Sequence, residues 1–233
     1  METNMSSRIV VVTGARGRLG RLVSERLLQS GAAVAALDVV PPDDLPAGAI
    51  PIGADLADEG DVAEAFTRIE DDLGAPTGLV HTVGMWDGAP LTATTLDAWE
   101  RVLRVNLTST FLCFREAARA MRRAGSGGRL VAIASRQGVE RGPAEQGGYA
   151  ASKAGVMRLV EAAAAEYASE GITACAIAPS MILFGDEDHG TRGVPASAIV
   201  DLCIYLCGDG GLVHNGSVLR AYGDSPAPLT AGV

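Results

Sequence analysis

The sequence predicts a single α/β domain in which a doubly wound parallel sheet is covered by helices on both faces. Short apolar runs, such as residues 9–12, alternate along the chain with longer segments of helical periodicity. Continuous runs of this kind are typical of strands buried on both faces, and their alternation with helices favours parallel pairing. The chain has 233 residues, of which 48% are hydrophobic, a size and composition that suit one domain with a large core.

The elements can be placed in order from their periodicity and their turn residues. We expect strands at 9–12, 34–37, 52–56, 78–83, 130–134, 172–178 and 217–222, and helices at 19–28, 58–73, 95–124 and 149–170. Residues 137–148 contain four glycines and a proline and are expected to form a loop. The predicted domain spans 8–225, between a flexible N-terminus at 1–7 and a tail at 226–233, and no internal repeat or domain boundary is visible.

Composition restricts the classes of partner. The net charge of −9 argues against nucleic acid, since phosphate binding needs a basic face. No apolar run reaches membrane-spanning length, and the polar start of the chain lacks a signal-peptide core, so no membrane partner and a cytoplasmic location are expected. The four cysteines have no Cys-x-x-Cys spacing or clustered histidine, which indicates buried free thiols and no metal site.

Three glycines at the end of the first strand form the first candidate site. Gly14, Gly17 and Gly20 lie between that strand and a helix, where glycine lets the backbone turn sharply and approach a pyrophosphate at the helix N-terminus. Asp38 ends the next strand, where a carboxylate can accept hydrogen bonds from the hydroxyls of an adenosine ribose. The pattern predicts a dinucleotide-binding Rossmann unit, and a plain strand-turn-helix is the alternative.

The choice between two dinucleotides depends on charge near Asp38. A carboxylate there repels a 2′-phosphate, which favours NAD as the cofactor. Arg16 and Arg18 in the glycine turn act in the opposite sense, because a basic side chain attracts that phosphate. NAD is preferred on the position of Asp38, and NADP is kept as the alternative.

Tyr149 and Lys153 form the second candidate site, on the helix expected at 149–170. Residues four apart lie on one helix face. A phenol titrates near 10, and a cation within a few ångströms lowers that pKa, so the pair is a proton-transfer device suited to neutral pH. The alternative is a surface tyrosine beside a solvated lysine.

These segments together resemble the short-chain dehydrogenase/reductases over nearly the whole chain. The matching pieces are residues 13–20, Asp55-Leu56, residues 99–106, Ser135 and Tyr149-Ala-Ala-Ser-Lys153, in the family's order and near its spacing. The resemblance implies that Tyr149 is the general acid/base and that Ser135 hydrogen-bonds the substrate carbonyl. It further implies that Lys153 holds the nicotinamide ribose and that Asn106 holds a water linking Lys153 to solvent.

The resemblance also implies which residues contact the dinucleotide. Asp55 is expected at the adenine amino group. The full predicted set is Gly14, Arg16, Gly17, Arg18, Leu19, Gly20, Asp38, Asp55, Leu56, Gly84, Tyr149, Lys153, Pro179 and Ser180. No metal ligand is implied.

Several positions depart from the family pattern. Arg18 stands where typical members have glycine, and the resulting spacing resembles the extended members that act on nucleotide sugars. Residues 81–84 read His-Thr-Val-Gly, so Thr82 replaces an asparagine and is expected to weaken an inter-strand or cofactor contact. Ser180 follows Pro179 where a glycine is usual. Residues 182–194, which include Asp186, Glu187, Asp188 and His189, are expected to form a short acidic substrate lid.

The predicted function is interconversion of a secondary alcohol and a ketone on a small organic substrate. One alternative is a ketoreductase acting on acyl-carrier-protein thioesters, which the acidic charge disfavours. Others are a nucleotide-sugar enzyme, for which little chain remains after Pro179, and a non-catalytic dinucleotide-binding regulator, for which an intact Tyr149–Lys153 pair is unexpected. The resemblance also implies a homotetramer or homodimer assembled through the helices that carry Asn106 and Tyr149.

Overall fold

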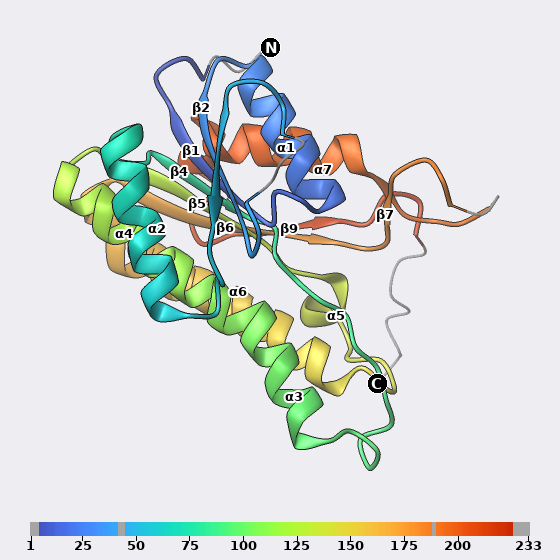
Figure 1. Ribbon diagram of the computed structural model, residues 1–233. Helices are drawn as coiled ribbons and strands as arrows, with labels where there is room; N and C mark the ends of the chain where they lie inside the picture. Colours follow the sequence, from blue (N-terminus) through green and yellow to red (C-terminus); the bar gives the residue numbers. More distant parts are fainter. Residues whose placement is uncertain (1–4, 42–44, 188–189, 226–233) are drawn as a thin grey trace.

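The computed structural model describes residues 5–41, 45–187 and 190–225, and it contains one large parallel sheet. The seven strands lie in the order β3-β2-β1-β4-β5-β6-β9, and every neighbouring pair is parallel (Figure 1). Their bounds are β1 (Ile9–Thr13), β2 (Ala33–Asp38), β3 (Ala49–Gly53), β4 (Gly78–His81), β5 (Gly128–Ile133), β6 (Ile172–Pro179) and β9 (Val218–Ala221). The predicted doubly wound fold is confirmed.

Helices cover both faces of this sheet. Their bounds are α1 (Arg18–Gln29), α2 (Glu59–Asp72), α3 (Leu96–Leu103), the π-helical turn η1 (Arg104–Thr108), α4 (Ser109–Ala124), α5 (Arg136–Val139), α6 (Gly147–Tyr167), the 3₁₀ turn η2 (Ala168–Glu170), α7 (Ala196–Cys207) and α8 (Gly210–Val213). The apolar sides of α2, α4 and α6 pack on one face of the sheet, and those of α1 and α7 pack on the other. Two short strands, β7 (Ile182–Leu183) and β8 (Val194–Pro195), pair with each other outside the main sheet.

The strand order reverses between β1 and β4. The chain leaves β1 toward β2 and β3, and then returns to the opposite side of β1 to form β4. At such a switch point the connections diverge, and a crevice forms beyond the carboxyl ends of the strands. Thr13, Asp38, His81, Ile133 and Pro179 end their strands at this edge, so the topology gathers both candidate sites there.

The long helix expected at 95–124 is divided by the π-turn η1. Thr95 caps its start by accepting a hydrogen bond from the Ala98 N–H at 3.1 Å. Within η1 the Ser109 N–H donates to the Arg104 carbonyl, five residues back, and this widening of the helix includes Asn106. Single π-turns within α-helices are often found at functional sites.

Two further segments differ from expectation. Met5, which falls in the segment expected to be a flexible N-terminus, is fully buried, and its N–H donates to the Ser30 carbonyl at 2.9 Å. The loop expected at 137–148 contains the end of α5 and the start of α6. Residues 1–4 and the predicted tail at 226–233 lie outside the described residues.

Candidate active site

The glycine turn between β1 and α1 has the close backbone packing that its sequence predicts. Gly14 adopts φ +69°, and its carbonyl accepts from the Gly17 N–H at 2.9 Å. A Cβ at Gly20 would lie 2.2 Å from the Gly14 carbonyl oxygen, so only glycine fits there. The N-terminus of α1 has no side-chain cap and no acid in its first turn. Its first N–H groups therefore lack an anionic neighbour and can receive one.

Asp38 holds this turn from the end of β2. Its carboxylate accepts from the Arg16 N–H at 2.9 Å and from the Val39 N–H at 2.8 Å. Arg18 extends instead toward the predicted lid. It donates to Asp186 at 2.8 Å, and its guanidinium lies 4.1 Å from the centre of the Phe184 ring.

The other adenosine-side residues lie on the neighbouring connection. Asp55 accepts from Arg104 at 2.9 Å and from the Ala57 N–H at 3.0 Å, so its carboxylate is already engaged by the start of η1. Leu56 is buried in the core that α2 covers, and Leu19 is buried beneath α1. Asp55 is thus a surface carboxylate paired with Arg104, while Leu19 and Leu56 belong to the two halves of the core.

Lys153 is buried beneath the carboxyl end of β5. Its ammonium donates to the Ile133 carbonyl at 2.8 Å, and 4% of the residue is exposed. An ammonium has three N–H donors, and Ile133 is the one acceptor for it among the described residues. Burial lowers the pKa of Lys153 to about 8. It is also the only lysine in the chain.

Tyr149 lies one helical turn before Lys153, and an interaction with the Ser135 side chain acts to lower its pKa. The Ser135 hydroxyl donates in turn to the Gln137 side-chain oxygen. Burial raises the pKa of Tyr149, and the Ser135 interaction only partly offsets this. The lowering of the Tyr149 pKa that was expected from Lys153 is not found, because desolvation of the phenolate dominates.

Asn106 joins the same group of side chains from η1. Its Oδ1 accepts from the Met85 N–H at 2.7 Å, and its Nδ2 donates to the Met85 carbonyl at 3.0 Å and to Ser152 Oγ at 2.9 Å. A Cβ on Gly84 would lie 3.0 Å from Lys153 Nζ and 3.3 Å from Asn106 Oδ1. The structure therefore brings together the lysine, the asparagine and the glycine that were predicted from separate segments.

A family model supports the same interpretation. The model described as short chain dehydrogenase matches residues 8–187. The chain belongs to the short-chain dehydrogenase family. Membership makes the protein an oxidoreductase that acts on CH–OH groups of small molecules with a nicotinamide dinucleotide.

Individual relatives agree with this assignment. The chain is 36% identical to cis-4-hydroxycyclohexanecarboxylate dehydrogenase of Sinomonas cyclohexanicum over 75% of this chain and 73% of the relative. It is 34% identical to the 3-oxoacyl-[acyl-carrier-protein] reductase MabA of Mycobacterium tuberculosis over 76% and 70% of the two chains. The crystal structure of levodione reductase superposes with a TM-score of 0.85 at 27% identity and covers 94% of this chain and 97% of the other.

Replacing Gly84 with Ala in this short-chain dehydrogenase is expected to displace Lys153 and leave the fold intact. The new Cβ would press on the flexible end of the lysine side chain, which can shift at little cost to packing. We expect turnover to fall by about tenfold to a hundredfold, since small misplacements of catalytic groups are costly. Steady-state kinetics and thermal unfolding would check this. Gly142→Ala is the control, because its Cβ would meet only Ala150 Cβ at an ordinary 3.5 Å. Equal kinetics for both variants would contradict the placement.

Thr82 and His81, at the end of β4, both form hydrogen bonds with Thr13 that were not expected from the sequence. Thr82 was expected to weaken a contact, but its hydroxyl donates to the Thr13 carbonyl at 2.6 Å and joins β4 to β1. Thr82 therefore makes an inter-strand contact of its own at this position. His81 is buried beneath the site between Thr13 and Ser109.

The burial of His81 predicts acid sensitivity of the fold. Desolvation, together with the nearby Lys153 charge, lowers the pKa of His81 to about 3 from 6.5. Between these values the unfolded chain binds the extra proton, so stability rises with pH over this window and is lost as the pH falls below 6.5. Denaturant unfolding should show a slope of up to ~1.4 kcal/mol per pH unit from this group. His81→Asn should reduce the slope between pH 3 and 6.5, and an unchanged slope would refute the assignment.

The end of β6 and the lid border the site on its other side. Pro179 ends β6, and the Ser180 hydroxyl donates to the Tyr222 carbonyl at 2.8 Å. Glu187 accepts from the N–H groups of Phe184 and Gly185 at 2.7 and 2.9 Å, which fixes the first half of the predicted lid. Asp188 and His189 lie outside the described residues.

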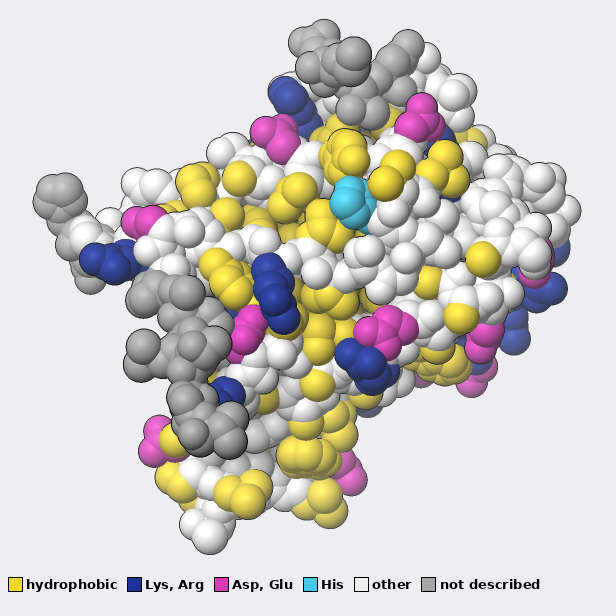
Figure 2. Space-filling model, turned by 180° about the vertical axis from the view of Figure 1, so that it is seen from behind, with side chains coloured by type: hydrophobic (Ala, Val, Ile, Leu, Met, Phe, Trp, Pro, Cys, Tyr) yellow, Lys and Arg dark blue, Asp and Glu magenta, His cyan; other side chains and the backbone are white. Residues whose placement is uncertain are grey.

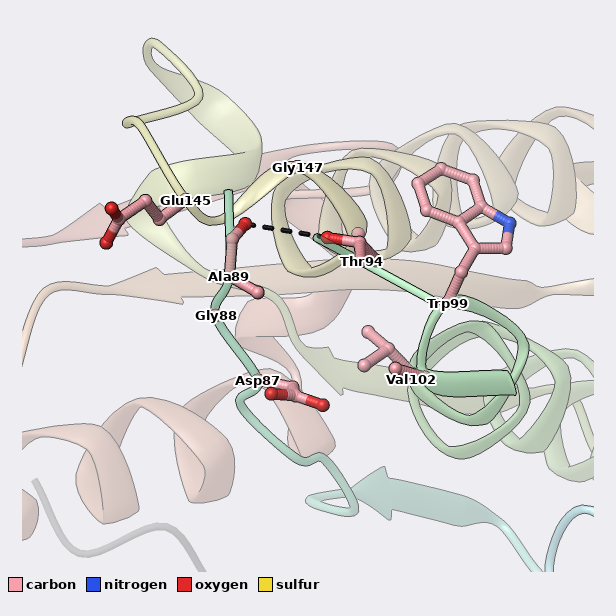
Figure 3. A pocket seen from close by; sticks show the side chains of 10 residues that line it. Asp87, Gly88, Ala89, Thr94, Trp99, Val102, Glu145 and Gly147 are labelled. Atoms are coloured by element: carbon pink, nitrogen blue, oxygen red, sulfur yellow. Dashed lines mark hydrogen bonds between the residues drawn. The ribbon is translucent and has the colours of Figure 1, made fainter. Parts of the chain in front are cut away.

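A small cavity lies beside the start of α6. It has a volume of about 30 Å³, and Figure 3 shows Asp87, Ala89 and Glu145 on one side and Trp99 and Val102 of α3 on the other. Thr94 donates to the Ala89 carbonyl across its edge at 3.5 Å. At this size the cavity has room for little more than one water. In the described part of the chain, no helix is both long and apolar enough to cross a membrane.

Proposed function

We propose that the enzyme interconverts a secondary alcohol and a ketone on a small organic substrate, with Tyr149 as the general acid/base. The observation that supports this most is the position of the Tyr149 phenol. It lies one turn from the buried Lys153, at the sheet edge that also carries the glycine turn, and the Ser135 side chain acts to lower its pKa. A proton donor, a carbonyl-binding hydroxyl and a cation are thus adjacent, as carbonyl reduction requires.

The residues present fit a nicotinamide dinucleotide. The uncapped N-terminus of α1 suits the pyrophosphate, and Asp38 suits the adenosine ribose. The unpaired donors of Lys153 suit the hydroxyls of the second ribose. When bound, the dinucleotide supplies or accepts the hydride.

The protein's own groups would manage the proton. Burial keeps the Tyr149 phenol protonated at neutral pH, so it can donate its proton to the substrate oxygen as that oxygen gains charge. The Ser135 hydroxyl would turn from Gln137 to the same oxygen. Lys153 would hold the hydroxyls of the second ribose, and Asn106 would hold a water that links Lys153 to solvent. In alcohol oxidation the proton moves in the opposite direction.

We propose NAD as the preferred dinucleotide. The Asp38 carboxylate at the end of β2 opposes a 2′-phosphate, while Arg18 is paired with Asp186. We expect NADH to bind at least about tenfold more tightly than NADPH, a difference of ~1.4 kcal/mol. Asp38→Asn keeps one acceptor oxygen and removes the charge. In a fluorescence titration it should therefore reduce the difference between the affinities for NADH and NADPH. Tighter binding of NADPH by the native enzyme would overturn the preference.

The substrate class is a small, unattached secondary alcohol or ketone. Two proteins similar to this one carry names that refer to such molecules, a hydroxycyclohexanecarboxylate and levodione. The resemblance to MabA supports an acyl-carrier-protein ketoreductase as the second candidate, but a chain of net charge −9 would repel an acidic carrier.

A panel assay tests the proposed function. Cyclic and acyclic ketones, secondary alcohols, a nucleotide sugar and a 3-oxoacyl thioester would be incubated with NAD(H) or NADP(H), and the absorbance of the reduced dinucleotide followed. Turnover of a small ketone or alcohol is the expected result. Turnover confined to the thioester or the nucleotide sugar, or dinucleotide binding without any turnover, would contradict the proposal.

We also propose that the enzyme is a homotetramer. Exposed hydrophobic side chains gather in the middle of the face shown in Figure 2. Among the described residues, large hydrophobic side chains that are exposed include Phe111 of α4, Tyr205 of α7, and Leu212 and Val213 of α8. Exposed apolar surface of this kind is typical of contacts between subunits. Light scattering should give the mass of four chains, or of two in a dimer, and a monomer at all concentrations would exclude both.

A further inference from the structure

We propose that His81 is a positioning residue that couples the glycine turn to the π-turn carrying Asn106. The coupling uses one directed chain of hydrogen bonds, from the Thr82 N–H through Thr13, His81 and Ser109 to the Val105 carbonyl. The proposal rests on the proposed function for its kinetic consequence. The chain itself is a property of the folded protein.

The direction of each hydrogen bond follows from its neighbours. The Ser109 hydroxyl donates to the Val105 carbonyl, so toward His81 Nε2, at 3.1 Å, it can only accept. His81 is therefore protonated on Nε2, and its Nδ1 accepts from the Thr13 hydroxyl at 3.0 Å. Thr13 Oγ1 in turn accepts from the Thr82 N–H at 3.3 Å. A single neutral tautomer of the His81 imidazole, with its proton on Nε2, is therefore consistent with every hydrogen bond in the chain.

The far end of this chain maintains the π-turn. The Ser109 N–H donates to the Arg104 carbonyl. The Val105 carbonyl, four residues before Ser109, therefore does not accept the usual helical hydrogen bond from that N–H. The Ser109 hydroxyl donates to the Val105 carbonyl instead, and the Thr110 hydroxyl donates to the Asn106 carbonyl at 2.7 Å. His81 holds the Ser109 hydroxyl in the orientation that this requires. It therefore stabilises the widened turn from which the Asn106 side chain reaches Met85 and Ser152.

The near end of the chain lies against the dinucleotide turn. Thr13 directly precedes Gly14, and a Cβ on Gly14 would meet the Thr82 hydroxyl at 2.9 Å. A dinucleotide that fixes the glycine turn thus also fixes Thr13. His81, Thr13 and Ser109 are each no more than 1% exposed, so water cannot replace these bonds. The position of Thr13 is consequently transmitted to Val105 and Asn106.

A double-mutant cycle tests the coupling. Thr13→Val and Ser109→Ala each cut the chain at one end and remove little volume. We expect each variant to lower kcat about tenfold, and the double variant to be no slower than either, because a chain cut once is already broken. Ser24→Ala is the control, because Ser24 is equally buried and also donates to a carbonyl four residues back, without a histidine partner. Its kcat should match that of the native enzyme.

Imidazole ¹⁵N NMR gives a readout that does not depend on turnover. In the native protein the spectrum should show the Nε2–H tautomer of His81, with a shift that changes on addition of NAD. In Thr13→Val that NAD-dependent change should disappear. If no substrate is turned over, the proposed function fails, and this measurement still decides the coupling. The proposal would be overturned if the His81 signals of the native protein did not change on addition of NAD. It would also be overturned if the loss of kcat in the double variant equalled the product of the losses in the two single variants.

Discussion

Tyr149→Phe is expected to lower kcat by about a thousandfold or more, with little change in the Kd for the dinucleotide. The substitution removes only the phenolic oxygen, the atom that would exchange a proton with the substrate. The ring remains in place on α6, so the cleft keeps its shape. The loss should appear equally in kcat and kcat/KM, which is the signature of an interaction made only in the transition state.

Tyr167→Phe is the matched control for this result. Tyr167 ends the same helix, and burial raises its pKa as it does that of Tyr149. It lies beside Arg122 and Glu170, far from the glycine turn, and should keep native turnover. If Tyr149→Phe and Tyr167→Phe were equally active, Tyr149 would not be the acid/base.

Lys153→Met is expected to lower kcat/KM by about a hundredfold to a thousandfold and to stabilise the fold at neutral pH. Activity falls because the variant loses the cation beside Tyr149 and the donors for the ribose. Stability rises because Lys153 is charged and buried, with the Ile133 carbonyl as its acceptor. Removing such a charge in favour of an apolar side chain of similar length relieves its desolvation.

The burial of Lys153 also predicts how the stability of the native protein changes with pH. The pKa of Lys153 is lowered to about 8 in the folded protein from 10.5, so between these values the unfolded chain binds the extra proton. Native stability should therefore gain ~3 kcal/mol from this group as the pH rises through that window, and Lys153→Met should lack the gain. Because the chain has one lysine, a ¹³C-lysine sample gives a single side-chain signal whose titration reads this pKa directly. A midpoint near 10.5 would contradict the burial argument.

The local spacing of residues predicted several of the contacts that the structure contains. The Tyr149–Lys153 interval and the glycine spacing at 14, 17 and 20 specify helix faces and turn geometry, which are local properties. Ser135 followed because it was placed at the end of an apolar strand. The protonation of these groups was not predictable in the same way. The raised pKa of Tyr149 depends on how much protein covers it, and burial is set by segments far apart in the sequence.

The π-turn was missed for a related reason. Residues 95–124 have uninterrupted helical periodicity, which predicts one regular helix. The widening at η1 depends on a hydroxyl–histidine contact between Ser109 and His81, which are 28 residues apart in the sequence. Asn106, as a poor helix former in mid-helix, was the one local signal that pointed to this turn. The helix α5 has only four residues, too few to show a period.

The most direct test of the proposed chemistry follows a labelled hydride. The native enzyme would be given NADH carrying deuterium at the reactive ring carbon, together with the ketones of the panel, and the alcohols would be examined by NMR and mass spectrometry. We predict one deuterium on the carbinol carbon of the product, with a single configuration at that carbon. Two NADH samples would be used, one with deuterium on each face of the nicotinamide ring. If neither sample gave an alcohol that carries deuterium, hydride transfer from the nicotinamide would be contradicted.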